Sequence, residues 1–364
     1  MRQIKVFLLV FLFSFTKLLA DDQSRFLEWK KNFRILAIEN GISEKTFDLT
    51  MNNVKFLSFI VFFIFLNSNK IYATDFENWK IEFKKYALEQ GISQKTLTDI
   101  IDNSRFLPDV IKYDRYQPEF YEDTKTYVSK RTSSKKVTIG KKLFNSNNKL
   151  IEIVSNEYSV DKNLLLALMG IETNFGTYLG KMDIVSSLAT LSFDKRRSKF
   201  FTQELIILLK LVDANIIDPK TLFGSWAGAF GNFQFMPSTI TNHAIDYNND
   251  NKIDLKNIED SFASAANYIK NLGWDNNIPC FFKINLKNNI PIKYLNTSAK
   301  KLKNKEKVKV FTKYISNNEF LNKYHDLNSA IITPDVDIVE NAEKLSPAYI
   351  VFDNYELILK WNRS

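Results

Sequence analysis

Cysteine and histidine are nearly absent from the sequence. A single cysteine, Cys280, excludes an internal disulfide and any metal cluster built from several cysteines. The two histidines, His243 and His325, are too few to favour a histidine metal centre or a histidine-based triad. We therefore expect any chemistry of this chain to use other side chains.

Acidic residues are outnumbered by basic ones, 41 to 50, which gives a net charge of +9. Such a balance suits an acidic partner, for example nucleic acid, an anionic membrane surface or a charged cell wall. The lysines are spread along the chain without a dense run, so a residue-usage bias explains the charge equally well. With 364 residues, 45% of them hydrophobic, the chain is long enough for two or three domains.

Glycine is also scarce, and six of the ten glycines lie between Gly170 and Gly231. Glycine gathers where the backbone bends sharply or approaches a ligand closely. The block 224–238 (GSWAGAFGNFQFMPS) adds aromatic, hydroxyl and amide side chains to the glycines. Sugar sites use this mixture of flat rings and hydrogen-bonding groups, although a glycine-rich turn between packed helices is the alternative.

A long apolar run precedes one carboxylate within this region. Every residue from Leu164 to Ile171 is apolar or glycine, which predicts a buried helix without a polar face, and Glu172 follows directly. Burial raises the pKa of a glutamate from about 4.3 towards about 6, the range useful to a general acid at neutral pH. The alternative is a glutamate at a helix end that points into water.

The beginning of the chain is repeated fifty residues later. Residues 1–20 carry a basic start and an apolar run, which is typical of an export signal and short for a membrane span. A second apolar run occupies residues 55–66, and the segment 29–46 recurs with many identities as 79–96. This is one long repeat that includes the signal.

The repeat predicts that a truncated copy of the N-terminus has been joined in front of a complete one. The working protein is then expected to begin at Met51, with Ala73 as the last residue of its signal. The alternative is a single membrane-anchored chain, held by its first apolar run or crossing the membrane near the second.

A loop rich in aspartate and asparagine follows the glycine region. Its oxygen-bearing side chains stand at positions one, three and five, as in the first part of an EF-hand loop. Asn251 replaces the turn glycine and Asn257 replaces the bidentate glutamate, and an Asn/Asp-rich surface turn is the alternative. The predicted ligands of a structural Ca²⁺ are Asp246, Asn248, Asp250, the carbonyl of Lys252, and Asp260.

Several of these motifs resemble, in the same order, those of the membrane-bound lytic murein transglycosylase B family. They are GIETNFG at 170–176, the pair Arg196-Arg197, the block 224–238, the aspartate loop and the segment 264–274, with 114–120 resembling an upstream element. The resemblance implies a mainly α, lysozyme-like helical core. It also implies cleavage of the β-1,4 bond between N-acetylmuramic acid and N-acetylglucosamine in peptidoglycan, with formation of 1,6-anhydromuramic ends.

The resemblance also implies roles for residues at matching positions. Glu172 matches the catalytic acid/base, and Ser225 matches a serine that orients the substrate or the attacking hydroxyl. Glycan-contacting positions are matched by Arg196, Arg197, Gln234, Phe235 and Tyr268. The aspartate loop matches the calcium loop of the family. Near the C-terminus Trp361 stands in place of a tyrosine, and Asn362 matches an active-site asparagine.

Such a transglycosylase needs no cofactor for its chemistry and only one carboxyl group. The acid protonates the leaving oxygen, and the resulting carboxylate takes the proton of the attacking 6-hydroxyl of the substrate. An ordinary glycosidase needs two carboxylates, and the candidates Asp183 and Asp194 lie in polar stretches. A binding-only relative and a hydrolytic lysozyme are the alternative functions.

The predicted organisation has six segments: 1–20 and 51–73 (signals), 21–50 (truncated duplicate), 74–145 (N-terminal helical region), 146–275 (catalytic core) and 276–364 (a small β-containing part and a return to the core). Within the last segment, the alternating run Lys307–Phe311 predicts a strand. We expect a periplasmic monomer, attached to a membrane if its apolar segment is retained, that binds peptidoglycan and not nucleic acid.

Overall fold

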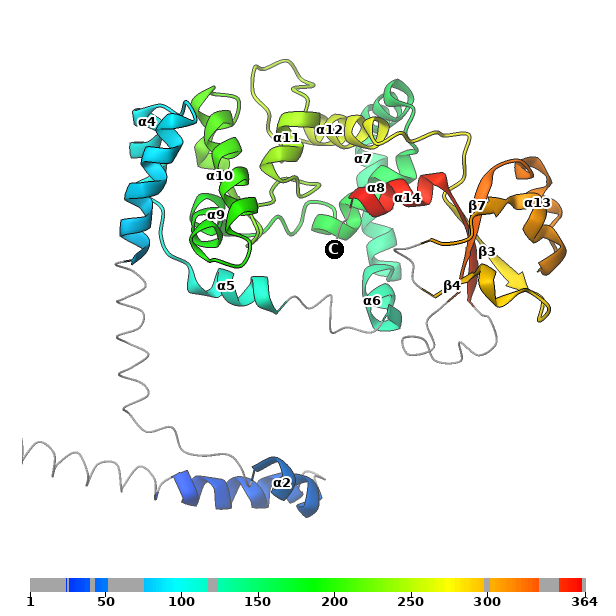
Figure 1. Ribbon diagram of the computed structural model, residues 1–364, viewed down its shortest axis with the longest axis horizontal. Coiled ribbons are helices and arrows are strands. Elements are labelled where there is room, and N and C mark those ends of the chain that lie inside the picture. The colour runs from blue at the N-terminus through cyan, green and yellow to red at the C-terminus, as the bar shows by residue number, and fades with distance from the viewer. Residues whose placement is uncertain are drawn as a thin grey trace, which may run out of the picture. The chain divides into compact units, whose positions relative to one another are not determined.

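The computed structural model describes residue 24 and residues 26–39, 43–51, 75–116, 124–297, 302–333 and 347–361. The chain divides into two compact units, Met1–Trp79 and Lys80–Ser364 (Figure 1). The predicted export signals, 1–20 and 51–73, lie outside the described residues apart from Met51. Among the described residues, no helix combines the length and the apolar character that a membrane crossing requires.

The smaller unit contains a helical hairpin formed by residues 26–39 and α2 (Glu44–Met51). Ala37 and Phe47 are buried between the two helices. The Arg34 guanidinium, on the first helix, lies 3.1 Å from the Glu44 carboxylate of α2. A hairpin of this size buries little apolar area, so it has a small core of its own.

The second copy of the repeat forms a helix, a turn and a second helix within the predicted N-terminal helical region. Helical backbone runs to residue 89, Gly91 turns with φ +86°, and α4 (Gln94–Thr96) leads into the π-helix η1 (Leu97–Ile101). The Asp213 carboxylate accepts hydrogen bonds from the Ser93 N–H (3.1 Å) and the Thr96 hydroxyl (2.5 Å). These bonds attach the turn to the end of α10.

The larger unit is built on a helical core in which α9 is central. Every residue of α9 from Ile184 to Ser192 is buried, so neighbouring helices surround it on all sides. Two short strands, β1 (Met182–Asp183) and β2 (Phe223–Gly224), pair antiparallel, and the 3₁₀ turn η3 (Pro219–Thr221) precedes β2. The helices are α5 (Pro108–Arg115), α6 (Thr124–Arg131), α7 (Ser134–Tyr158), α8 (Lys162–Thr173), α9 (Ile184–Phe193), α10 (Ser198–Asp213), α11 (Pro237–His243) and α12 (Ile258–Asn271).

The helix α8 differs from the sequence expectation in one respect. Leu165, Leu168 and Met169 are buried as predicted, but Ala167 and Ile171 are exposed. Residues four apart lie on the same helix face, so α8 has a narrow apolar face in contact with solvent. The prediction of complete burial is therefore wrong for that face.

A small mixed sheet follows the helical core, as predicted for the region after residue 276. Its strand order is β4-β7-β8-β3-β6, with β5 pairing with β7, and only the β4–β7 pair is parallel. Ile284, Ile331 and Ile350 from three neighbouring strands join one buried cluster with Val308 and Phe311. The strands are β3 (Phe281–Leu286), β4 (Leu295–Asn296), β5 (Glu306–Lys307), β6 (Ile315–Ser316), β7 (Asn328–Ile332) and β8 (Ala348–Phe352).

The predicted strand at Lys307–Phe311 is wrong in most of its length. Glu306 and Lys307 form β5, but Val308–Phe311 is the short helix α13. Val308 and Phe311 are both fully buried, which helical spacing of three residues allows and strand alternation does not. The remaining elements of this part are the 3₁₀ turns η4 (Ile292–Tyr294), η5 (Thr312–Tyr314) and η6 (Glu319–Tyr324).

The last helix, α14 (Asp353–Trp361), leaves the sheet after β8 and returns to the helical core beside α8 (Figure 1). The chain thus inserts the sheet between α12 and α14. The return matters for the site, because it brings Trp361, the last residue of α14, to the C-terminal turn of α8.

Candidate active site

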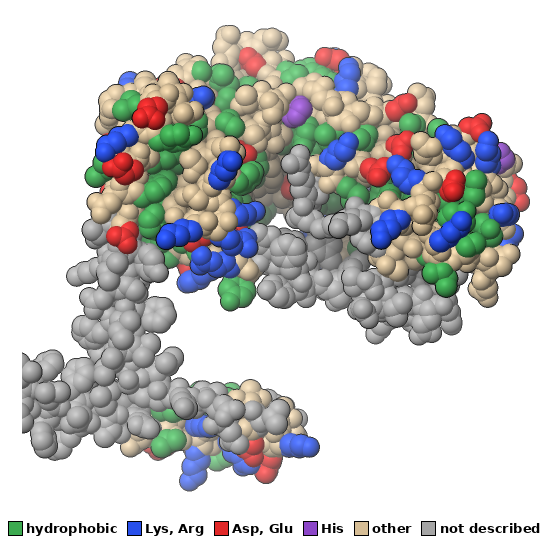
Figure 2. Space-filling model, viewed as in Figure 1, with side chains coloured by type: hydrophobic (Ala, Val, Ile, Leu, Met, Phe, Trp, Pro, Cys, Tyr) green, Lys and Arg blue, Asp and Glu red, His purple; other side chains and the backbone are tan. Residues whose placement is uncertain are grey.

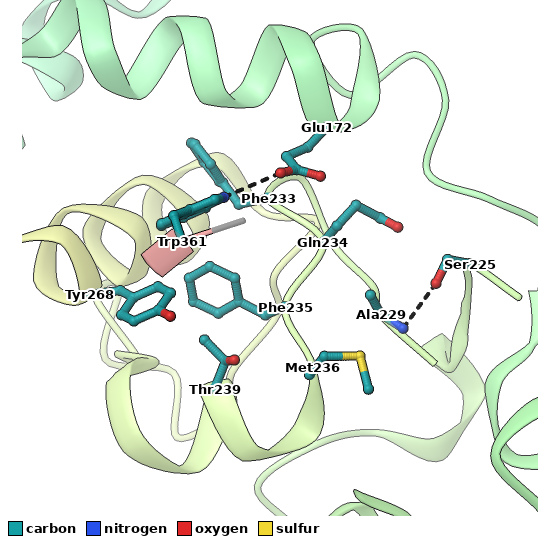
Figure 3. Close-up of a pocket in the computed structure, with 10 residues that line it drawn as sticks. All are labelled: Glu172, Ser225, Ala229, Phe233, Gln234, Phe235, Met236, Thr239, Tyr268 and Trp361. Carbon is teal, nitrogen blue, oxygen red and sulfur yellow. Dashed lines mark hydrogen bonds between the residues drawn. The ribbon is translucent and has the colours of Figure 1, made fainter. Parts of the chain in front are cut away.

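A cavity of about 330 Å³ opens between the end of α8, the loop before α11, and the helices α12 and α14 (Figure 3). Its volume is in the range of small-ligand sites. The lining combines one carboxylate, hydroxyl and amide groups and several aromatic rings. These residues are Glu172, Ser225, Ala229, Phe233, Gln234, Phe235, Met236, Thr239, Tyr268 and Trp361.

Glu172 lies in the last turn of α8 with its carboxyl group directed into the cavity (Figure 3). The Trp361 indole N–H donates a hydrogen bond of 3.2 Å to its Oε1 atom. Burial raises the pKa of Glu172 above its ordinary value, and the bond from Trp361 opposes that rise. The environment therefore favours a carboxyl that keeps its proton to higher pH than a glutamate in water.

The chain reverses directly after this carboxyl. Asn174 (φ 50°), Phe175 (φ 60°) and Gly176 (φ 76°) are three consecutive residues in the left-handed region. Two of them are not glycine, so the reversal is strained and must be stabilised by its surroundings. The Thr173 hydroxyl provides part of this, since it donates to the Asn232 carbonyl at 2.8 Å and accepts the Gly176 N–H at 3.0 Å.

The Phe175 ring also stabilises the strained reversal, because it fills a narrow space between α7 and α8. A β-carbon on Gly140 of α7 would lie 2.7 Å from the ring, and one on Gly170 of α8 would lie 2.6 Å from it. Both distances are shorter than real contacts, so only glycine allows the ring to enter. The glycine two residues before Glu172 thus helps to fix the turn that follows it.

Ser225 stands at the opposite side of the cavity, directly after β2. Its hydroxyl oxygen accepts the Ala229 N–H at 3.0 Å, and its own N–H donates to the Ala229 carbonyl at 2.8 Å. Gly180 makes this arrangement possible, since a β-carbon there would lie 2.1 Å from the Gly224 carbonyl oxygen. The hydroxyl proton of Ser225 stays available to a ligand.

Gln234 occupies the tip of the loop between the two sides. Its backbone is left-handed (φ 50°), and its amide nitrogen donates to the Gly231 carbonyl at 2.9 Å. In Figure 3 the amide group extends from the loop between Glu172 and Ser225. The strained backbone and the held amide present a polar group at the floor of the cavity, as expected at a functional site.

Aromatic rings form one wall of the cavity. The Trp361 ring lies 5.0 Å from Tyr268 and 5.6 Å from Phe235, and Tyr268 in turn stacks on His243 at 4.4 Å. Flat faces of this kind are suited to stacking against the apolar faces of sugar rings. The predicted residues Glu172, Ser225, Gln234, Phe235 and Tyr268 are therefore brought together in one cavity.

Arg196 and Arg197 are placed elsewhere, in an ion cluster around Asp114. The Asp114 side chain is 1% exposed, and the Arg196 guanidinium donates to its carboxylate at 2.6 Å and to its carbonyl at 2.7 Å. Arg197 also pairs with this carboxylate, and Arg115 pairs with Asp194 at 2.7 Å. Figure 2 shows basic side chains gathered over α5, which carries Asp114.

This cluster holds the Asp114 carboxyl ionised. Burial alone would raise its pKa, but the hydrogen bonds from Arg196 and Arg197 outweigh burial and lower the pKa below its ordinary value. The two arginine side chains remain 46% and 39% exposed, so they can still meet a ligand. Neither arginine is among the cavity-lining residues that the structure describes.

In the aspartate loop, carboxylates bind backbone N–H groups. Asp246 accepts from Asp250 (3.1 Å), and the fully buried Asp260 accepts from Tyr247 (2.9 Å) and Asp254 (3.0 Å). These oxygens are hard donors of the kind that Ca²⁺ prefers. Among the described residues, however, no group of three His, Cys, Asp or Glu side chains is arranged to hold a metal.

The side chains of two other predicted ligands are also bonded within the protein. The Asn248 side-chain oxygen accepts the Asp250 N–H at 3.0 Å. The Lys252 ammonium turns away and donates to the side-chain oxygen of Asn215 at 2.6 Å. The loop therefore fits calcium in the chemistry of its donors, while its side chains are not gathered around one point.

Two residues near the C-terminus were named from the sequence, Trp361 and Asn362. Asn362 lies outside the described residues. Trp361 lines the cavity and bonds Glu172, a role that the sequence did not indicate beyond its matching a tyrosine position. A return to the core was predicted for this region, but nothing local in the sequence shows that it brings Trp361 to Glu172.

A helical core with one carboxyl group in a cavity walled by aromatic rings defines a lysozyme-like protein. Residues 75–364 match the family model described as the transglycosylase SLT domain, and the chain belongs to this family. It is 41% identical over 118 residues to membrane-bound lytic murein transglycosylase B of Escherichia coli (strain K12). That match covers 32% of this chain and spans a third of that relative's length, 33%.

Solved structures give the same fold. SltB3 from Pseudomonas aeruginosa, in complex with NAG-NAM-pentapeptide, superposes with a TM-score of 0.70 at 27% identity over 79% of this chain and 75% of that one. The Escherichia coli lytic transglycosylase Slt35, in complex with calcium, gives a TM-score of 0.63 at 25% identity over 80% and 87%. The predicted resemblance, the lysozyme-like helical fold and the class of enzyme are thereby confirmed at the level of the family.

Proposed function

We propose that this protein is a lytic transglycosylase that cleaves the MurNAc–GlcNAc β-1,4 bond of peptidoglycan and forms 1,6-anhydromuramic ends, with Glu172 as its single acid/base. Membership of the transglycosylase SLT domain family supports the reaction class. The NAG-NAM-pentapeptide bound to SltB3 supports peptidoglycan as the ligand. The cavity described above supplies the residues.

The observation that carries the proposal is the number of carboxyl groups at the cavity. Among the described lining residues, Glu172 is the one carboxylate. Asp183 caps α9 by accepting the Ser186 N–H at 2.8 Å, and Asp194 pairs with Arg115. A retaining or inverting glycosidase needs a second carboxyl group beside the scissile bond, which this arrangement does not offer.

One carboxyl group suffices if the nucleophile comes from the substrate. Burial keeps Glu172 protonated to higher pH, so it can donate its proton to the leaving oxygen of the glycosidic bond. The carboxylate that results then accepts the proton of the 6-hydroxyl of the muramic ring as that oxygen attacks the anomeric carbon. The proton count balances, because Glu172 ends the cycle protonated and ready for the next turnover.

Ser225 and Gln234 are proposed to orient this attack. The Ser225 hydroxyl already accepts one N–H, so its own proton is directed to a ligand oxygen. The Gln234 amide lies at the cavity floor with its nitrogen bonded to Gly231, which leaves its oxygen as an acceptor. Stacking on Tyr268 and Phe235 would hold the adjoining sugar ring.

The proposal extends to location and metal. A substrate in the cell wall requires a periplasmic protein, and the membrane-bound name of the Escherichia coli relative supports membrane association. A structural Ca²⁺ in the aspartate loop is supported by the oxygen donors there and by the calcium complex of Slt35.

The test is incubation of purified peptidoglycan with the full chain and with Glu172→Gln, followed by mass spectrometry of the soluble muropeptides. We expect anhydromuramic ends from the unchanged protein and a loss of release of at least about 10²-fold from the variant. Glu157→Gln removes a carboxylate on α7 that bonds the Tyr247 hydroxyl and serves as the matched control. Reducing ends would make the protein a hydrolase, and binding without release would make it a scaffold.

A further inference from the structure

The Trp361 indole is the one described side chain that hydrogen-bonds the Glu172 carboxyl group. Its N–H lies 3.2 Å from Oε1, and Figure 3 shows the indole edge directed at that oxygen. An indole nitrogen is a donor and never an acceptor. It can therefore bond a carboxyl oxygen but cannot receive the proton that Glu172 gives away.

Three neighbouring rings fix the orientation of this donor. The Trp361 ring lies 5.0 Å from Tyr268 at an interplanar angle of 30°, and it meets Phe235 and Phe233 edge-on at 5.6 and 6.2 Å. Contacts on several sides leave few alternative rotamers for a ring of this size. The N–H is thus held towards Glu172 before any ligand binds.

The helix that carries Trp361 is anchored at its opposite end. Asn354 is 1% exposed, and its amide nitrogen donates to the carbonyls of Asp275 (2.7 Å) and Ile278 (2.6 Å) while its oxygen accepts the Asp275 N–H (3.2 Å). The Lys305 ammonium also pairs with Asp353, in the first turn of the helix, at 3.1 Å. The sheet and its anchors therefore set the position of Trp361 at the last residue of α14.

We propose that Trp361 is a positioning residue for Glu172: it holds the carboxyl group at one wall of the cavity and stabilises its ionised form. This inference deepens the proposed function, since it concerns the same acid/base. A hydrogen bond to a charged acceptor is stronger than one to a neutral acceptor, so the N–H stabilises the carboxylate more than the acid. The bond therefore lowers the cost of the ionised state that follows proton donation.

The first test is Trp361→Phe, which removes the N–H and keeps a ring among its neighbours. The basic limb of the pH profile of kcat/KM, which reports the ionisation of Glu172, should move to higher pH by roughly half a unit to one unit. The maximal kcat should fall about tenfold, because the carboxylate loses its donor. The matched control is Trp274→Phe. The Trp274 indole donates a hydrogen bond of 2.7 Å to Asn276, and Trp274 is not among the described residues that line the cavity.

The second test does not require turnover. Tryptophan emission of the unchanged protein is recorded across the acidic and neutral pH range, and we expect a titration that disappears in Glu172→Gln and in Trp361→Phe but persists in Trp274→Phe. If cleavage is absent and this titration is present, the proposed function fails and the inference stands. If Trp361→Phe is active and leaves both the pH profile and the pH titration of the emission unchanged, the inference is overturned.

Discussion

Glu172 and Asp114 are two carboxylates of the helical core with opposite electrostatic environments. Glu172 lies in a cavity beside aromatic rings, and its described side-chain partner is the neutral indole of Trp361. Asp114 is buried between the guanidinium groups of Arg196 and Arg197. Burial dominates at the first and raises the pKa, whereas the two positive charges dominate at the second and lower it.

The difference shows that burial alone does not decide what a carboxylate does. A neutral donor leaves most of the desolvation cost in place, so the group keeps its proton to higher pH than a carboxyl group in water. Two cations remove that cost, so the group stays charged and joins the elements that carry its partners. Asp114 on α5 thereby ties that helix to the segment between α9 and α10.

The largest expected effect comes from neutralising each carboxylate in turn. Asp114→Asn should reduce the free energy of unfolding by about 1–3 kcal/mol, because two partly exposed arginines lose their buried partner. Glu172→Gln should leave stability within about 1 kcal/mol, because an amide costs less to bury than a carboxylate. Urea unfolding of the two variants measures both changes.

Equal losses of stability in the two variants would contradict the difference between the environments of Glu172 and Asp114. So would a Glu172→Gln variant that is the less stable of the two, since that would make Glu172 a structural ion-pair member. A useful companion is Asp109→Asn, which removes an exposed carboxylate on the same helix as Asp114, paired with Lys112. Its effect on stability should stay within about 0.5 kcal/mol.

A comparable effect on stability is expected at the turn that follows Glu172. Gly170→Ala should destabilise the fold by about 1–3 kcal/mol and lower cleavage, because the new methyl group displaces the Phe175 ring and releases the strained reversal. The double variant Gly170→Ala/Phe175→Leu makes room for the methyl group. If the two changes prove additive in urea unfolding, the methyl group does not act through the ring.

A smaller effect distinguishes the two carboxylates by pH. The raised pKa of Glu172 means that its contribution to stability is fully present below the unfolded value of about 4.5 and is lost as pH rises through the folded value. The lowered pKa of Asp114 means that its contribution is present above the unfolded value of about 3.8 and is lost as pH falls through the folded value. The two groups therefore act in opposite directions.

Unfolding free energies measured across pH test these signs. Relative to the unchanged protein, Glu172→Gln should gain stability as pH rises above about 4.5, and Asp114→Asn should lose its deficit as pH falls below about 3.8. Parallel curves for the two variants would show that the environments are not opposite.

The sequence predicted the parts of this site that are local. Apolar spacing and glycine density are properties of neighbouring residues, so α8 and the glycine-rich loop with Gln234 were recognisable. Asp161 accepts the Asn163 N–H at 2.7 Å and caps the start of α8. The family resemblance added the residues that converge on one cavity.

What the sequence did not predict depends on long-range packing. The partner of Glu172 is 189 positions away, across the inserted sheet. The segment Val308–Phe311 is a helix and not the predicted strand. Val308 and Phe311 are both buried against the sheet, and the alternating pattern of the sequence does not indicate this burial. The exposed face of α8 likewise depends on which neighbours are present, and an apolar run does not encode them.

The smallest expected effect concerns the aspartate loop, which presents a third environment for carboxylates. There the negative charge is balanced by backbone N–H groups, which are dipoles, so a divalent cation adds the charge that the loop lacks. At ten times its dissociation constant, Ca²⁺ would stabilise the fold by about 1.4 kcal/mol and raise Tm by about 2–4 °C. Differential scanning fluorimetry with millimolar Ca²⁺ measures this shift.

Asp250→Asn should abolish the response to Ca²⁺, because it removes a carboxylate whose two oxygens face the Lys252 N–H (2.8 Å) and the Asn248 amide (3.2 Å). Asp218→Asn changes an aspartate that caps η3 outside the loop, and its response should match that of the unchanged protein. A Tm that is indifferent to millimolar Ca²⁺ would show that backbone dipoles alone satisfy these carboxylates. In that case the negative charges of the loop would resemble that of Asp114, since groups of the protein itself would stabilise them. Of the carboxylates compared, Glu172 would then be the one whose negative charge its surroundings stabilise too little to offset burial.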